Sequence, residues 1–225
     1  MDQGQHINTT VQPLLILGKR GTLAGAFARI CRSRNIYHIV LGRPEIDICN
    51  DLTDILEQYS PWAVINATGY VNVDGAEEDS DSCERINSHA VHQLARACAA
   101  SNIRLVNFSS DLVFDGHKGQ PYFETDGTRP LNVYGKSKGL AEMYLRAVYP
   151  GALTIRTSAF FGAWDNYNFI HTTLQSLLNN EKTFAATDMI VSPTYVPHLV
   201  HAALDLLIDD ECGIWHLANK GAISW

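Results

Sequence analysis

The stretch that decides the fold is Leu14-Leu15-Ile16-Leu17-Gly18-Lys19-Arg20-Gly21-Thr22-Leu23-Ala24. It begins with an unbroken apolar run, turns at a glycine, and continues into a helical spacing of apolar side chains at Leu23, Phe27, Ile30 and Cys31. A buried strand followed by a tight turn and a helix is the repeating unit of a parallel sheet. The stretch therefore predicts an α/β protein.

The same order of strand and helix continues along the chain. We expect further strands at residues 37–41, 63–66, 104–109, 153–157 and 214–218. We expect helices at residues 52–59, 83–100, 134–148, 169–178 and 196–208, with a long loop rich in glycine and proline at 111–133. Strands that are apolar throughout, rather than alternating, indicate a parallel sheet covered by helices on both faces.

Length and composition exclude several classes of protein. The chain has 225 residues, 46% apolar and 18% charged, which suits one domain or one domain with an added lobe. No run approaches the roughly 20 apolar residues of a membrane span, so we expect no membrane partner. Five cysteines in no CxxC spacing indicate reduced thiols and a cytoplasmic protein. A net charge of −7 argues against a nucleic-acid surface.

The glycine-containing turn lies where a dinucleotide-binding loop belongs. Gly18 would permit the tight turn, Gly21 would let the backbone approach a pyrophosphate, and Ala24 would fill the close-packing position. The anion would then meet free N–H groups at the positive end of the first helix. The expected cofactor-binding residues of this loop are Gly18, Lys19, Arg20, Gly21, Thr22 and Leu23.

The end of the second strand reads Leu41-Gly42-Arg43. A site for NAD would place an acidic residue there to bind the ribose 2′-hydroxyl. Arg43, together with Lys19 and Arg20, offers positive charge that could pair with a 2′-phosphate instead. The sequence therefore favours NADPH, with NADH as the alternative cofactor and a solvated Arg43 as the alternative interpretation.

Tyr134 and Lys138 form a YxxxK spacing at the start of a predicted helix, which puts both side chains on one face. A free tyrosine has a pKa of about 10, and a neighbouring ammonium group would favour its anion. Ser109 or Ser110, at the end of the preceding strand, could position a carbonyl oxygen. This combination predicts acid–base chemistry on a carbonyl group beside a nicotinamide cofactor.

Two other patterns suggest different chemistry. The segment 135–139 is formally GxSxG, with Asp165, Asp188, His198 and His216 following in an order that a hydrolase triad allows. A nucleophile elbow needs a buried strand before it, however, and the preceding residues are polar and contain a proline. The histidine pairs 89/92 and 198/201 have no neighbouring ligands that would complete a metal site, so we expect no metal.

Several blocks together resemble one family. They are Gly18 to Leu23, 64–67 (VINA), 73–77 (VDGAE), 109–116 (SSDLVFDG), 130–138 (PLNVYGKSK), 156–158 (RTS), 192–194 (SPT) and 216–219 (HLAN). From Leu14 to Trp225 the chain resembles the extended short-chain dehydrogenases/reductases, and within them the dTDP-4-dehydrorhamnose reductase (RmlD-like) family. The resemblance implies a Rossmann-type doubly wound parallel sheet with a small substrate-binding lobe, and NADPH-dependent reduction of a nucleotide-linked 4-keto-6-deoxy sugar.

The resemblance also implies roles for individual residues. The catalytic residues would be Ser110, in place of the family's usual threonine, with Tyr134 and Lys138. Cofactor contacts beyond the loop would come from Arg43, Asp47, Ile48, Asn66, Ala67, Thr68, Tyr134 and Lys138. Substrate contacts would come from Val71, Ser110, Asp111, Phe114, Ala159 and Asn168.

The departures from the family pattern fall mainly on the substrate side. The family's tryptophan after Arg-Thr-Ser is Ala159 here, and its glutamine and glycine before Ser-Pro-Thr are Met189 and Val191. We expect the lobe to be formed by parts of about 160–225, and Ser224 to cap a helix whose remainder is missing from a truncated chain. Residues 1–13 would be a polar extension or linker.

Three further expectations come from the resemblance. Related domains occur fused behind a family-1 glycosidase, so the polar start would suit a fusion or association with a sugar-modifying domain. The regulatory beta subunit of methionine adenosyltransferase shares the fold, which makes a non-catalytic NADP-binding subunit the alternative function. The oligomeric state is left open.

Overall fold

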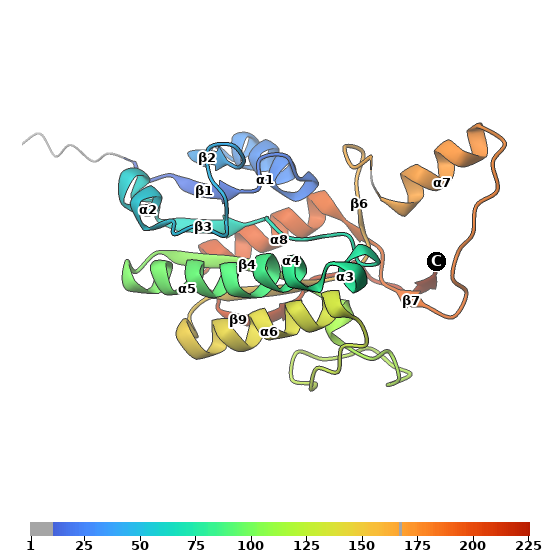
Figure 1. The fold of residues 1–225 in the computed structure, drawn as a ribbon. Coiled ribbons are helices and arrows are strands. Elements are labelled where there is room, and N and C mark those ends of the chain that lie inside the picture. Colours follow the sequence, from blue (N-terminus) through green and yellow to red (C-terminus); the bar gives the residue numbers. More distant parts are fainter. Residues whose placement is uncertain (1–10, 167) are drawn as a thin grey trace, which may run out of the picture.

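A parallel six-stranded sheet forms the centre of the molecule in the computed structural model, which describes residues 11–166 and 168–225 (Figure 1). Its strands are β1 (Leu14–Leu17), β2 (His38–Leu41), β3 (Ala63–Asn66), β4 (Arg104–Ser110), β5 (Leu153–Thr157) and β9 (Gly213–His216). Their order is β2-β1-β3-β4-β5-β9, and every neighbouring pair is parallel. The chain reverses direction across the sheet at β1, which makes the carboxyl end of β1 the switch point where such folds bind ligands.

Helices cover both faces of this sheet. On one face lie α1 (Thr22–Ser33) and α8 (Val196–Ile208), which pack against each other. On the other face lie α2 (Thr53–Tyr59), α5 (Ala90–Ala100) and α6 (Val133–Val148). The predicted α/β class with a doubly wound parallel sheet is confirmed, and each predicted strand is present with ends within about two residues of the observed ones.

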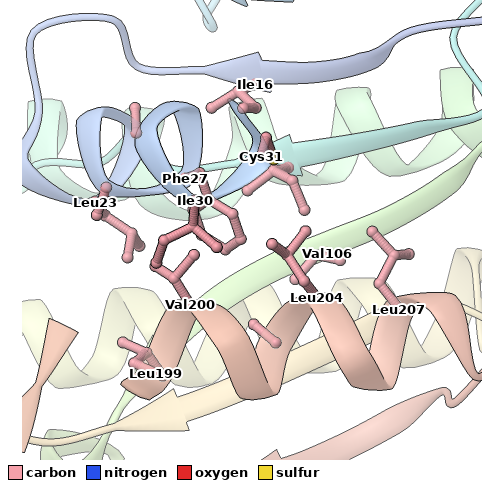
Figure 2. Packing of buried hydrophobic residues seen from close by; sticks show 14 of the residues in the cluster. Ile16, Leu23, Phe27, Ile30, Cys31, Val106, Leu199, Val200, Leu204 and Leu207 are labelled. Carbon is pink, nitrogen blue, oxygen red and sulfur yellow. The ribbon is translucent and has the colours of Figure 1, made fainter. Parts of the chain in front are cut away.

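The larger of two apolar cores lies between the sheet and the pair α1 and α8 (Figure 2). Phe27 of α1 meets Phe108 of β4 edge to face, with ring centroids 5.8 Å apart. From α8, Val200 and Leu204 point toward α1 and are fully buried. The second core forms between the sheet and α2, α5 and α6. The apolar strands of the sequence are explained by this burial on both sides.

The helix predicted at residues 83–100 is interrupted. It begins earlier, as α4 (Ser80–Glu84), passes through a π-helical turn η1 (Arg85–His89), and continues as α5. In the π-helical turn, Ser88 Oγ donates to the Ser137 carbonyl at 2.8 Å, and Asn87 Nδ2 donates to Ser137 Oγ at 3.1 Å. The turn thereby directs two polar side chains into α6, a long-range requirement that helical periodicity does not reveal.

Short elements complete the fold. They are α3 (Gly75–Glu78), the 3₁₀ turn η2 (Asp111–Val113), β6 (Phe160–Phe161), α7 (Phe169–Leu178), β7 (Ile190–Val191), β8 (Thr194–Tyr195) and β10 (Ile223–Ser224). β6 pairs with β8, and β10 pairs antiparallel with β7. Ser224, expected to cap a helix, pairs with Ile190 in this small sheet, and its role as a helix cap stays a prediction. In Figure 1, α7 and β7 extend away from the main sheet.

Across residues 11–166 and 168–225, the structure contains no helix that is both long enough and apolar enough to cross a membrane. The predicted extension at 1–13 falls mostly on residues 1–10, which lie outside the described residues.

The core between α1 and α8 gives a stability prediction. Leu204 is fully buried and Leu178 of α7 is 75% exposed, so Leu204→Ala should lower the free energy of unfolding by about 2–5 kcal/mol and Leu178→Ala by less than about 0.5 kcal/mol. Urea denaturation of the two variants beside the parent chain measures both values. Equal losses would mean that α8 is not packed as described.

Candidate active site

The loop between β1 and α1 has the geometry of an anion cradle. Gly18 has φ +111°, and a Cβ added there would lie 2.6 Å from the Ala67 carbonyl oxygen, so only glycine fits. The N–H groups of Gly18 and Lys19 donate to the Leu41 carbonyl at 2.8 and 3.1 Å. Gly21 is the N-cap of α1 and has no side chain to accept from the first turn, whose N–H groups can therefore receive a phosphate. Thr22 and Leu23 are the first helical residues.

Charged side chains follow the end of β2. Arg43 donates to Asp47 Oδ2 through Nε at 3.1 Å and lies 2.8 Å from it through Nη2, and Lys19 pairs with Glu45. The pKa of Asp47 is lowered, first by the backbone N–H of Cys49. These ion pairs are exposed and therefore weak, so a 2′-phosphate could replace the carboxylates as a partner of the cations. The sequence had not shown that acidic side chains already neighbour both cations.

Asn66, at the end of β3, shapes the next part of the edge. It is buried, donates through Nδ2 to Asn107 Oδ1 at 2.8 Å, and accepts from the Thr68 hydroxyl at 2.6 Å. These bonds fix the turn at Ala67 and Thr68, whose backbone lies against Gly18. Within this structure Asn66 therefore orients the loop that adjoins the cradle. Ile48, another predicted cofactor contact, is buried in the second apolar core.

Tyr134 and Lys138 lie on one face of α6, with the Lys138 ammonium 5.7 Å from the centre of the Tyr134 ring. Lys138 is buried, and its Nζ donates to the Phe108 carbonyl at 3.1 Å. Burial lowers the pKa of Lys138 to about 8, against the opposing influence of Cys83 and Glu142. A lysine with that pKa is mostly protonated at neutral pH and can lose its proton within the physiological range.

The pKa of Tyr134 moves in the direction opposite to the one expected. It is raised, first by burial and then by the carboxylate of Asp111 and by Cys83. Desolvation and the Asp111 carboxylate both disfavour the tyrosinate, so the pKa of Tyr134 is not lowered in the protein without ligand. Tyr134 is a neutral phenol at neutral pH, which makes it a proton donor rather than a base.

Ser110 and Asp111 stand beside this pair at the end of β4. The Ser110 hydroxyl donates to Asp111 Oδ1 at 3.0 Å and accepts from the Leu112 N–H at 3.1 Å. The other Asp111 oxygen accepts from the Ser158 hydroxyl. Burial raises the pKa of Asp111, while the two serine hydrogen bonds lower it. Ser110 is thus the cap of η2 as well as a candidate for contacting a substrate.

A backbone contact sets the depth at which α6 packs. A Cβ added at Gly135 would lie 2.1 Å from the Leu112 carbonyl oxygen, so no other residue fits without moving the helix. Asn132 caps α6 by accepting from the Gly135 N–H at 2.6 Å. The helix that carries Tyr134 is therefore fixed to the turn that follows Ser110.

A buried ion pair that the sequence analysis missed connects α6 to β5. Arg156 donates to both carboxylate oxygens of Glu142, at 2.9 and 2.7 Å, and Ser109 donates to the same carboxylate at 2.5 Å. Arg156 Nη1 also lies 3.2 Å from His216 Nε2, whose pKa is lowered, first by burial. The signal that could have found this network is the presence of charged residues inside segments with an otherwise apolar pattern.

The predicted substrate residues occupy different surroundings. Val71 is 76% exposed, whereas Phe114 is buried and stacks on Tyr122 with centroids 4.1 Å apart. Ala159 accepts from the Thr194 N–H at 3.1 Å, and Asn168 caps α7 by accepting from His171. The role of these four residues in binding a substrate stays a prediction.

The alternative chemistries have less support. Ser137 of the GxSxG segment is buried, and its hydroxyl donates to the Tyr134 carbonyl at 2.7 Å inside α6, so it cannot act as an exposed nucleophile on an elbow. Among residues 11–166 and 168–225, no cluster of three or more histidine, cysteine or acidic side chains is placed to bind a metal ion. His198 instead contacts Tyr195 and Asn219.

Comparison with known sequences identifies related proteins. The family model described as the RmlD substrate binding domain matches residues 12–225. A dTDP-4-dehydrorhamnose reductase of Aggregatibacter actinomycetemcomitans is 34% identical over 221 residues, covering 94% of this chain and 75% of that protein. The spore coat polysaccharide biosynthesis protein SpsK of Bacillus subtilis is 30% identical, with 94% and 75% covered.

Solved structures agree with these matches. The dTDP-4-dehydrorhamnose reductase of Bacillus anthracis in complex with NADP superposes with a TM-score of 0.90 at 27% identity, covering 95% of this chain and 76% of that one. A UDP-glucose 4-epimerase of Thermus thermophilus complexed with NAD has a TM-score of 0.81 at 17% identity, with 94% and 79% covered, and shows the shared fold alone.

The buried ammonium group gives a pH prediction. The folded protein has a Lys138 pKa of about 8, below the value of about 10.4 for an unfolded lysine. Between these values the unfolded chain binds more protons, so the free energy of unfolding rises with pH. Relative to Lys138→Met, the parent chain should gain about 1 kcal/mol from pH 8 to pH 9 in paired denaturation curves. A constant difference would contradict the assigned burial.

Proposed function

Because the chain belongs to the RmlD substrate binding domain family, we propose that it is an NADPH-dependent reductase of a nucleotide-linked 4-keto-6-deoxy sugar. The observation that carries the proposal is the placement of Tyr134 and Lys138 on α6 beside the carboxyl edge of the sheet. At the switch point of the same edge lies the glycine cradle, the loop Gly18–Leu23 between β1 and α1. Its shape requires glycine at position 18. A dinucleotide and a carbonyl compound can meet between them.

The described residues divide the work of a carbonyl reduction. When bound, the cofactor supplies a hydride to the carbonyl carbon. Tyr134 is neutral, so its hydroxyl can donate a hydrogen bond to the carbonyl oxygen and then its proton. Lys138, mostly protonated at neutral pH, lies close enough to favour the tyrosinate that this leaves. Ser110 would orient the same oxygen by turning its hydroxyl proton from Asp111 toward it.

The cofactor would lie across the edge in a definite direction. Its pyrophosphate would bind at Gly18–Leu23, with the adenosine and 2′-phosphate toward β2 and Lys19, Arg20 and Arg43. The loop at Asn66–Thr68 would border the middle of the cofactor. The nicotinamide would then reach the side of α6 that carries Tyr134.

The substrate assignment is the finer part of the proposal. The nucleotide sugar would contact Ser110 and Asp111 at the edge, and the remaining predicted substrate residues, Val71, Phe114, Ala159 and Asn168, from the surrounding loops. The lobe would be built from parts of about 160–225, where α7 and the two small sheets lie. Asp2–Gln12 and the rest of residues 1–13 would serve as an extension or linker.

The setting of the protein is also proposed. Cys31, Cys49, Cys83, Cys98 and Cys212 are all free thiols. This suits a reducing cytoplasm, the compartment in which sugar nucleotides are available to such a reductase. A fused or associated sugar-modifying domain, such as a glycosidase, would be the partner.

The first functional test removes one hydroxyl. Tyr134→Phe deletes the proton donor but keeps the ring, so kcat for NADPH oxidation with a 4-keto sugar nucleotide should fall by about 10² to 10⁴, with little change in the Kd for NADPH. Tyr144→Phe makes the same change on the outer part of α6, where Tyr144 packs on His92, and should retain activity. If NADPH binds but the parent chain turns over no substrate, a regulatory NADP-binding subunit is the correct function.

The second functional test concerns the 2′-phosphate. A charge-assisted hydrogen bond contributes about 1.5–3 kcal/mol, so Arg43→Gln should weaken NADPH roughly ten- to a hundredfold and leave NADH unchanged. Calorimetric titration of both cofactors measures this. Arg146→Gln, which removes an exposed arginine from the end of α6, is the control and should change neither affinity. Equal losses for the two cofactors at Arg43 would count against a 2′-phosphate contact.

A further inference from the structure

Thr157 presents a buried hydroxyl that the structure leaves unsatisfied. It is the last residue of β5 and is 7% exposed, yet its Oγ1 has no hydrogen-bond partner among residues 11–166 and 168–225. Buried hydroxyl groups are normally paired, because leaving one unpaired costs free energy. An unpaired hydroxyl at the carboxyl edge of a parallel sheet is where a bound ligand would complete the pairing.

The register of the sheet places Thr157 beside Ser110. The two residues are direct partners on the parallel strands β5 and β4. Side chains alternate along a strand, and Ser109 and Arg156 both bond to Glu142 of α6. Ser110 and Thr157 therefore share the opposite face, the one covered by α1 and α8.

Only one of these two neighbouring hydroxyls lacks a hydrogen bond within the protein. Ser110 already donates to Asp111 and accepts from the Leu112 N–H, so its burial is compensated without a ligand. Thr157 has neither bond and can both donate to and accept from a ligand.

The strand order indicates which ligand reaches this point. The glycine cradle lies at the end of β1, and β3, β4 and β5 follow in that order. With strands about 4.8 Å apart, β5 lies about 14 Å from β1 along the edge. A dinucleotide with its adenosine toward β2 and its pyrophosphate at β1 extends in this direction, with its nicotinamide end leading. The Thr157 side chain also lies on the sheet face that α1 covers, and the first turn of α1 forms part of the cradle.

We propose that the Thr157 hydroxyl binds the carboxamide of the nicotinamide ring, an inference that rests on the proposed function. A carboxamide carries one acceptor oxygen and an N–H₂ donor, which match a hydroxyl that can both donate and accept. The contact fixes the rotation of the ring and hence the face that it turns toward Tyr134. Thr157 is thereby a cofactor-binding residue that determines from which face the hydride leaves.

The test removes the hydroxyl with little change of shape. Thr157→Val should weaken NADPH roughly three- to tenfold, the loss expected for one neutral hydrogen bond. The same variant should bind 2′-phospho-ADP-ribose, which lacks the nicotinamide, as tightly as the parent chain does. Thr157→Ser keeps a hydroxyl and should retain most of the NADPH affinity. Calorimetry with both ligands on all three proteins provides the comparison.

Stability separates a ligand contact from a structural role. Because the Thr157 hydroxyl is unpaired in the parent chain, Thr157→Val should leave the thermal midpoint of the ligand-free protein unchanged or raise it. Thr194→Val is the matched control, since the Thr194 hydroxyl is buried and donates to the Ser192 carbonyl at 3.0 Å, and it should lower the midpoint.

The outcomes distinguish the two proposals. A Thr157→Val variant that binds NADPH like the parent, weakens both ligands equally, or changes only the KM for the sugar nucleotide would overturn the carboxamide contact and leave the proposed function standing. A parent chain that binds neither NADPH nor 2′-phospho-ADP-ribose would overturn both.

Discussion

The close approach of α6 to the turn after β4 is the constraint on which the candidate site depends. It exists because Gly135 has no side chain to meet the Leu112 carbonyl oxygen. The contact brings Tyr134 and Lys138 to the strand edge, and it buries the Lys138 ammonium against the Phe108 carbonyl. The same depth of packing explains why the two catalytic candidates have pKa values shifted by desolvation. A loosely packed helix would leave both groups hydrated and unperturbed.

The buried pair of Arg156 and Glu142 adds a second fixed point along α6. Removing two charges from water is costly, so the bidentate geometry and the additional bond from Ser109 are needed to offset the cost. The pair contributes more to placement than to net stability. It joins Glu142 of α6 to Arg156 of β5, on the same helix that carries Tyr134.

Local sequence patterns were sufficient to predict the sheet and the helix face that carries Tyr134 and Lys138. Strand burial and helical spacing both depend on the order of apolar residues within a short segment. The turn at Gly18 could also be predicted from the sequence, since only glycine adopts the φ of Gly18 at low cost. The raised pKa of Tyr134 could not be predicted, because it depends on Asp111 and on burial, which are set by packing between distant segments. The pairing of Arg156 with Glu142 and the unpaired hydroxyl of Thr157 depend on the same long-range geometry.

The π-helical turn at Arg85–His89 restricts insertions and deletions in this segment. One extra residue in a turn offsets the two flanking helices by about 100° around their common axis. Before the turn, Cys83 faces α6, and after it Val91 and Leu94 face the sheet. Deleting one residue here would restore a regular helix but rotate one of these faces into solvent. Insertions and deletions should therefore be far less tolerated in this segment than in the long loop that precedes α6.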